Sequence, residues 1–172
     1  SSDVCSSDLK ENSAWILLPN IRDLMICGVF CVYKERKRMT KKELALEYHK
    51  KGYNCAQAVA CAFCEELGVS ETEMYKIAEG FGLGMGMMDT CGALTGLFML
   101  IGLKNSGGTE QAGKTKASTY KKTKEYAAKF QEINGSVYCK ELKGVATGKI
   151  LAPCDKCILD AVELAEQFLK EN

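Results

Sequence analysis

The residues that most constrain the fold lie between positions 91 and 103, where the sequence reads CGALTGLFMLIGL. Apart from Thr95, every residue of this run is apolar, so a helix built from it carries apolar groups on all sides. A helix that is apolar all round belongs in the core of a protein. We therefore predict that this segment is the buried central helix and that the other segments pack around it.

Helix-start signals divide the chain before this segment. Thr40 with Glu43 three residues later has the spacing of a capping box, and it predicts a helix that ends near Gly52. Asn54 is the predicted cap of one helix through residues 55–67. Ser70 is the predicted cap of the next. The glycine-rich run GLGMGMMDT that follows is too rich in glycine for a helix.

Similar signals mark the helices in the later part of the chain. Asp89 or Thr90 is the predicted cap of the central helix, and Ser136 that of a short helix carrying Cys139. Amphipathic patterns predict long helices over residues 114–135 and 153–172. No strand-like alternation of useful length occurs. The expected fold class is all-α, a single compact helical bundle of about six helices.

The first 38 residues differ from the rest. The run VCSSDL at positions 4–9 resembles the translation of a sequencing adapter, and Met39 follows Lys34-Glu35, which a ribosome-binding sequence can encode. We expect residues 1–38 to be a non-native extension, read through from adapter and upstream DNA, or a disordered and irregular segment. Residues 39–172 are then the helical domain.

Ten cysteines in 172 residues, with a net charge of +1, narrow the classes of function. A near-neutral chain gives no electrostatic reason to expect a nucleic-acid partner. The early apolar run LMICGVFCVY is too short to cross a bilayer, so no membrane insertion is expected. Without a signal-peptide pattern we predict a cytoplasmic protein, in which many cysteines indicate metal or redox chemistry.

Four of the seven cysteines outside the first 38 residues occupy one kind of position, the beginning of a predicted helix: Cys55, Cys91, Cys139 and Cys154. Free N–H groups and the helix dipole at such a position stabilise a thiolate, which is both the nucleophile and the metal-binding form of cysteine. Four helix starts at one pole of a bundle would gather these sulfurs into one site.

The other cysteines have different settings. Cys157 forms a C-x-x-C pair with Cys154, a spacing that suits redox exchange or metal binding. Cys61 and Cys64 lie inside a predicted helix among alanines and are interpreted as buried packing residues.

Other candidate residues carry weaker signals. His49, the only histidine, is interpreted as part of a solvated helix face, with a ligand role as the alternative because Cys55 is six residues away. Met85, Met87 and Met88 are interpreted as gap-filling residues, with soft metal ligation as the alternative. The glycine-rich run lacks the preceding strand and the G-K-[ST] ending of a phosphate-binding loop.

Four motifs resemble one known family: YNCAQAV, GFGLGMG with DTCGALTG, YCKELKG, and PCDKCILDAVELAEQFL. The family is C_GCAxxG_C_C, small prokaryotic proteins described as redox-active, and the resemblance runs from about Thr40 to Lys170. It implies that the four signature cysteines are Cys55, Cys91, Cys139 and Cys154. It also implies that Gly92, Ala93 and Gly96 complete the central motif, with Cys157 as an addition. A further likeness to part of split-Soret cytochrome c implies a helical fold and iron chemistry, although no C-x-x-C-H haem motif is present.

The leading hypothesis is a redox protein, an oxidoreductase or electron-transfer protein acting with an unknown partner. Its cysteines would hold an iron–sulfur cluster or another soft metal, or cycle between dithiol and disulfide. The metal version is slightly favoured, with Cys91 as the central ligand. Gly84 and Gly86 are expected to shape the surroundings of that ligand and to take part in binding the cofactor. The alternatives are a non-catalytic metal-trafficking or sensor protein, and a bundle whose cysteines only pack. A homodimer is compatible with the apolar central helix.

Overall fold

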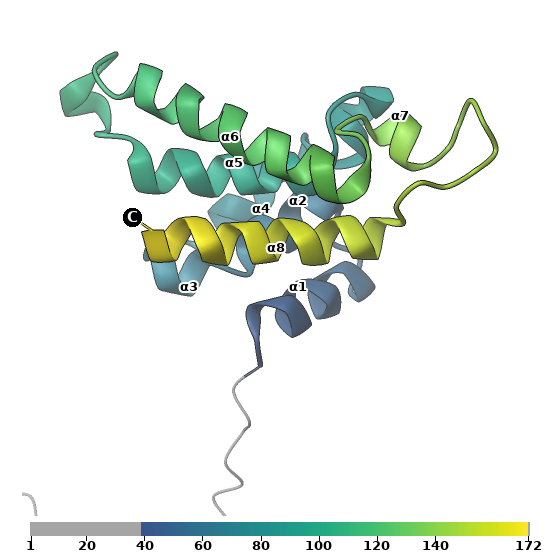
Figure 1. Cartoon of the computed structure of the whole chain (residues 1–172). Coiled ribbons are helices and arrows are strands. Elements are labelled where there is room, and N and C mark those ends of the chain that lie inside the picture. The colour runs from purple at the N-terminus through teal and green to yellow at the C-terminus, as the bar shows by residue number, and fades with distance from the viewer. Residues whose placement is uncertain (1–38, 172) are drawn as a thin grey trace, which may run out of the picture. The chain divides into compact units, whose positions relative to one another are not determined.

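The computed structural model describes residues 39–171, and within them it contains eight α-helices and no strand. The predicted all-α class is confirmed (Figure 1). The helices are α1 (Lys41–Lys50), α2 (Cys55–Cys61), α3 (Cys64–Leu67), α4 (Glu71–Glu79), α5 (Gly92–Asn105), α6 (Lys116–Asn134), α7 (Cys139–Leu142) and α8 (Cys154–Glu171). Two short turns, η1 (Gly84–Met88) and η2 (Thr109–Gln111), complete the elements. The prediction for the N-terminal extension, with Cys5, Cys27 and Cys31, lies outside the described residues.

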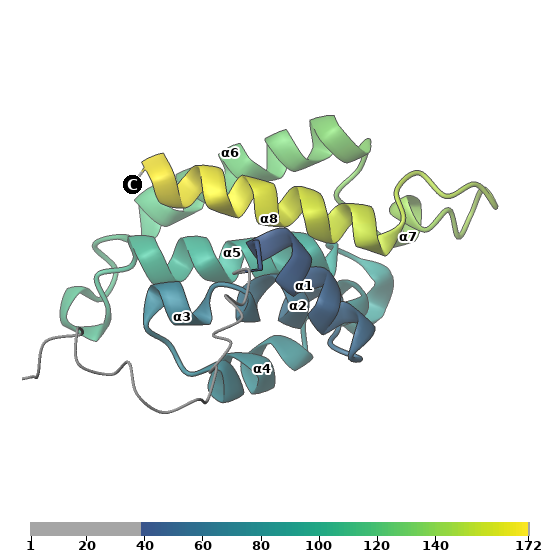
Figure 2. The same cartoon turned by 90° about the horizontal axis from the view of Figure 1, so that it is seen from below.

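Helix α5 is the central helix, as predicted. It packs against α2 on one side and against α6 and α8 on the other (Figures 1 and 2). Its residues from Gly92 to Leu97 are all buried, but Phe98 and Met99 are only half-buried and Leu103 is exposed. Leu100 and Ile101 are fully buried, so the expectation of burial along the whole segment is wrong only for Phe98, Met99, Gly102 and Leu103.

Helices α5 and α8 lie side by side and run in the same direction (Figures 1 and 2). Their N-termini lie at the end of the domain where α7 is found. The large buried side chains between the helices include Phe63, Leu97, Phe130 and Phe168. No described helix combines the length and apolarity needed to cross a membrane.

The helix caps observed near the start of the domain are those predicted from the sequence. Thr40 and Asn54 both form complete capping boxes, with Glu43 and Gln57 as their respective partners. The Ser70 side chain accepts a hydrogen bond from the Glu73 N–H. Polar side chains at these positions satisfy N–H groups that the first turn leaves unpaired.

Two other predicted caps are wrong. Neither Asp89 nor Thr90 caps α5, because Cys91 itself is the N-cap residue. The short helix α7 begins at Cys139 without a side-chain cap, and Ser136 accepts from the N–H of Tyr138 instead. The segments that precede α5 and α7 pair with each other through their backbones, and this pairing replaces the local caps.

The single helix predicted over residues 55–67 is also wrong, because Ala62 and Phe63 interrupt it. The Nζ of Lys41 donates a hydrogen bond of 2.9 Å to the carbonyl of Ala62, which satisfies an acceptor outside the helical pattern. The Phe63 ring turns into the core and is fully buried. Tertiary contacts thus outweigh a favourable local helix propensity.

The glycine-rich run forms a wide turn, η1, rather than a regular helix. Gly84 and Gly86 have φ values of +59° and +72°, and Leu83, Met85 and Met88 also have positive φ. Such backbone is uncommon for residues with a side chain. The run therefore folds back sharply between α4 and α5.

Candidate redox site

The starts of α5 and α7 are joined by an isolated antiparallel bridge between Thr90 and Tyr138. The N–H of Cys91 donates to the Val137 carbonyl at 2.8 Å, and the N–H of Cys139 donates to the Asp89 carbonyl at 2.6 Å. These bonds bring Cys91 and Cys139 to the same pole of the domain, although the two residues lie 48 positions apart in the sequence.

 The bridge therefore replaces side-chain caps at both helix starts, because each segment provides a carbonyl that accepts a hydrogen bond from a backbone N–H of the other.

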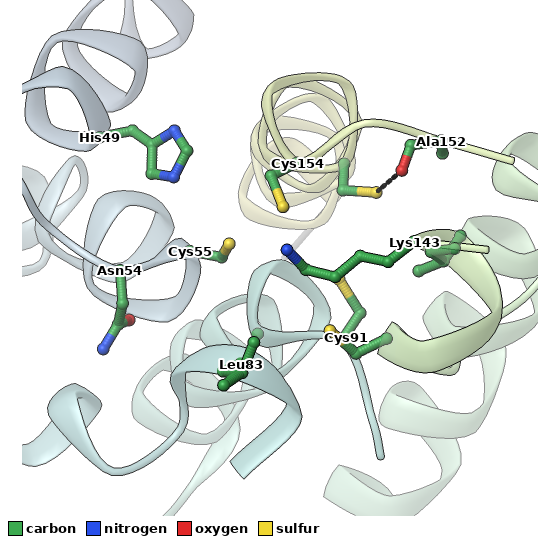
Figure 3. A pocket seen from close by; sticks show the side chains of 12 residues that line it. His49, Asn54, Cys55, Leu83, Cys91, Lys143, Ala152 and Cys154 are labelled. Atoms are coloured by element: carbon green, nitrogen blue, oxygen red, sulfur yellow. Dashed lines mark hydrogen bonds between the residues drawn. The ribbon is translucent and has the colours of Figure 1, made fainter. Parts of the chain in front are cut away.

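Five cysteines line one cavity of about 220 Å³ at this pole: Cys55, Cys91, Cys139, Cys154 and Cys157. They come from the starts of α2, α5, α7 and α8, so the predicted gathering of helix starts is what the structure shows. His49, Asn54, Leu83 and Lys143 complete much of the wall (Figure 3). All seven cysteines of the described residues are free thiols.

Small residues allow α2 and α5 to meet at this pole. A Cβ added to Gly92 would lie 3.2 Å from the Cβ of Cys55, and one added to Gly96 would lie 2.8 Å from the Ala56 carbonyl oxygen. Ala93 between them is fully buried. The central motif thus provides the close approach that brings Cys55 to Cys91.

Cys154 and Cys55 form the first thiol pair. A hydrogen bond from Cys55 lowers the pKa of Cys154 to about 5, and the nearby Lys143 ammonium adds to the effect. The same bond, together with burial, raises the pKa of Cys55. One member of the pair is therefore the thiolate and the other the thiol.

Cys91 and Cys157 form a second pair of the same kind. A hydrogen bond from Cys157 lowers the pKa of Cys91, and the N–H groups of Ala93 and Leu94 in the first turn of α5 add to this. The pKa of Cys157 is raised by that bond and by burial. The N–H contribution is the one expected for a cysteine at a helix start.

Among the cysteines that the structure describes, Cys139 has no such thiol partner, and burial raises its pKa. Lys143, one turn after it, reaches into the cavity toward Cys154 and Cys55 (Figure 3). The charge of the Cys154 thiolate raises the pKa of this lysine. Lys143 is thus the cation of the site, and the sequence analysis missed it because nothing near it marks a lysine that faces sulfur.

His49 also faces the cavity, so its interpretation as part of a solvated helix face is wrong. Its side chain is 28% exposed, and its Nδ1 lies 2.8 Å from Oδ1 of Asp155. Figure 3 shows the ring beside Cys55 and Cys154. The carboxylate orients the imidazole, a partnership that joins α1 to the start of α8.

The other predicted residues lie farther from the sulfurs. Gly84 packs against Cys139, since an added Cβ would lie 2.9 Å from the Cβ of that residue, but Gly86 is exposed with open space around it. Met87 is 72% exposed, so it fills no gap in the core. The roles of Gly84 and Gly86 in binding a cofactor stay predictions.

The arrangement of these side chains bears on the predicted metal site. Across residues 39–171, no group of three or more His, Cys, Asp or Glu side chains is placed to hold a metal ion. The sulfurs around the cavity are arranged as two pairs and a single thiol. The role of the five cysteines as metal ligands therefore stays a prediction.

A family model described as "Putative redox-active protein (C_GCAxxG_C_C)" matches residues 53–168, which include all five cysteines of the cavity. The chain belongs to this family. The predicted resemblance to C_GCAxxG_C_C is thus confirmed, and with it a redox-active protein as the coarse description of function. No curated protein and no solved structure matches the chain.

Proposed function

We propose that this C_GCAxxG_C_C protein carries out thiol–disulfide exchange, with Cys154 as the attacking thiolate and Cys55 as the resolving thiol. The observation that carries the proposal is the contact between these two sulfurs beside the Lys143 ammonium. A thiolate is the nucleophile in exchange, and a neighbouring thiol is needed to complete it.

The reaction proceeds in two substitutions. The Cys154 thiolate attacks one sulfur of a substrate disulfide, forms a mixed disulfide and releases one substrate thiolate. The Cys55 thiol passes its proton to that leaving thiolate and attacks the sulfur of Cys154, which releases the second substrate thiolate. The protein dithiol is oxidised to a Cys55–Cys154 disulfide, and the substrate disulfide is reduced to one thiol and one thiolate, which takes its proton from water.

Cys91 and Cys157 would form the second dithiol of the same cavity. Their protonation states match those of the first pair, with Cys91 as the thiolate and Cys157 as the thiol. Because the charge of Cys154 acts on Cys91, the two thiolates are neighbours. A disulfide formed at one pair can therefore move to the other by exchange within the cavity.

A metal or an iron–sulfur cluster is the second candidate, favoured by five sulfurs around one cavity. Thiolates are the ligands of such groups, and this function would suit an electron-transfer, metal-trafficking or sensor protein. It ranks second because the described sulfurs are paired, and no three of them are placed around a common point.

The setting is also proposed rather than observed. Free thiols persist in a reducing compartment, so we propose that the protein acts in the cytoplasm with a redox partner that remains to be identified. The homodimer expected from the sequence is a proposal of the same kind.

Peptide mapping tests the function directly. The anaerobically purified chain is titrated with oxidised glutathione, free thiols are alkylated, and disulfides are assigned by mass spectrometry. We expect a Cys55–Cys154 disulfide, and we expect a persistent glutathione adduct on Cys154 in Cys55→Ser. Tightly bound iron with sulfide, or a dithiol that stays reduced at every ratio of oxidised to reduced glutathione, would instead contradict the proposal.

A further inference from the structure

His49 brings an imidazole ring to the cavity that holds the thiols. It is the next-to-last residue of α1, while Cys55 begins α2 and Cys154 begins α8. All three side chains line the same cavity of about 220 Å³. Figure 3 shows the ring directed toward the two sulfurs. A proton-accepting side chain therefore stands beside the pair that exchanges disulfides.

The contact between His49 and Asp155 determines which ring nitrogen faces the sulfurs. Nδ1 of His49 lies 2.8 Å from Oδ1 of Asp155. An ionised carboxylate only accepts hydrogen bonds, so Nδ1 carries the proton of the neutral ring. Nε2, on the opposite side of the ring from Cγ and Nδ1, then has a free lone pair and can accept a proton.

Cys55 is the side chain that needs a proton acceptor. It attacks the mixed disulfide at Cys154 as a thiolate, because a thiol is a poor nucleophile. The hydrogen bond with Cys154 raises the pKa of Cys55, and burial raises it further. Without a base to take its proton, Cys55 would rarely be ionised and the second substitution would be slow.

The other titratable groups near the sulfurs do not supply this base. Lys143 is an ammonium ion whose pKa is raised by thiolate charge, so it keeps its proton. Asp155 bonds the far side of the imidazole and is 65% exposed. Cys91 and Cys157 share a hydrogen bond with each other, and burial raises the pKa of Cys139. Among the described residues, the imidazole is the group placed to accept the proton.

We propose that His49 accepts the proton of Cys55 in the second substitution, and that Asp155 positions its ring for this transfer. The inference rests on the thiol–disulfide exchange proposed for the cavity. As Cys55 attacks Sγ of Cys154, its proton moves to Nε2, directly or through one water, and from Nε2 to the first substrate thiolate. The bond between Cys154 and the second substrate sulfur breaks as the protein disulfide forms. The imidazole is neutral again at the end.

Single-turnover oxidation of the full chain separates the two substitutions. The reduced chain is mixed with oxidised glutathione, samples are alkylated at successive times, and mass spectrometry follows the glutathione adduct on Cys154 and the Cys55–Cys154 disulfide. In His49→Ala, we expect the adduct to form at close to the wild-type rate and to resolve about a hundredfold more slowly, since general-base catalysis contributes at least that much. Asp155→Asn should slow resolution by at most about fivefold, the effect of an exposed ion pair.

Rescue by added imidazole is a readout that a merely structural role would not change. Imidazole should shorten the lifetime of the adduct in His49→Ala, where it can replace the missing ring. It should have no effect in His49→Ala with Cys55→Ser, which has no resolving thiol to deprotonate. Lys50→Ala changes the exposed neighbour of His49 on α1 and should resolve the adduct at the wild-type rate.

The outcomes distinguish this inference from the function on which it rests. Resolution as fast in His49→Ala as in the wild-type chain would overturn the role of His49 and leave the exchange function intact. Slow resolution that imidazole does not accelerate would also overturn it, because the ring would then act only on the fold. A wild-type chain that forms no Cys55–Cys154 disulfide would instead overturn the exchange function, and this inference with it.

Discussion

Lys143 reaches from the end of α7 to hydrogen-bond the sulfur of Cys154 at the start of α8. The contact joins the end of the short helix α7 to the start of the long helix α8, and no local sequence pattern links the two. It places the cation of the site beside the sulfur whose pKa is lowered to about 5.

The first prediction concerns this lysine. In Lys143→Gln, the pKa of Cys154 should rise by roughly half a unit, because an exposed charge contributes less than about 1 kcal/mol. The measurement is the rate of iodoacetamide labelling of Cys154 against pH, read by peptide mapping. Lys143→Arg keeps the charge and should leave the midpoint near its original pH. An unchanged midpoint in the glutamine variant would show that the Cys55 hydrogen bond alone stabilises the thiolate.

The second prediction concerns stability and pH. The pKa of Cys154 is about 5 in the folded chain and that of an unfolded cysteine is about 8.5, so the folded state binds fewer protons between these values. The free energy of unfolding therefore rises with pH across this window, and this contribution is lost as pH falls through about 5. The raised pKa of Cys55 adds nothing there, because that thiol is protonated in both states.

Urea unfolding of the reduced chain at several pH values measures this effect. The difference in unfolding free energy between the wild-type chain and Cys154→Ser should grow from pH 5 to pH 8. A constant difference would mean that the Cys154 thiol is not ionised in the folded protein.

The third prediction concerns the contact between α2 and α5. Gly96→Ala should lower the free energy of unfolding by about 1–3 kcal/mol, because the added Cβ would meet the Ala56 carbonyl oxygen at 2.8 Å. Gly102→Ala is the matched control in the same helix, since nothing lies within 4 Å of its added Cβ. That substitution should stabilise the chain by up to about 1 kcal/mol. Similar effects of the two in urea unfolding would contradict the close packing.

The fourth prediction concerns the cap of α2. Asn54→Ala removes the side-chain half of its capping box, the acceptor of the Gln57 N–H, and should cost about 1 kcal/mol of unfolding free energy. It also frees the first turn that carries Cys55, so the Cys55–Cys154 disulfide should form more slowly. Thr40→Ala removes the equivalent side-chain acceptor at the start of α1, remote from the sulfurs, and should destabilise the chain to a similar extent without that delay.

Local signals predicted much of the fold. The caps predicted at Thr40, Asn54 and Ser70 marked three helix starts correctly, and the apolar run predicted the position of α5. The caps proposed at Thr90 and Ser136 failed because the bridge between Thr90 and Tyr138 joins segments that are distant in the sequence. No local pattern reports such a pairing.

The sequence by itself determined where α1, α2 and α4 begin, where the small residues of the central motif lie and which cysteines of the cavity stand at or near helix starts. These properties depend on side chains a few residues apart, and so they can be read from spacing. Only the tertiary structure decided that Cys154 meets Cys55, that Cys91 meets Cys157, and that Lys143 and His49 face the same cavity. These contacts depend on how α1, α2, α5, α7 and α8 pack, and packing is a property of the whole core rather than of any one segment.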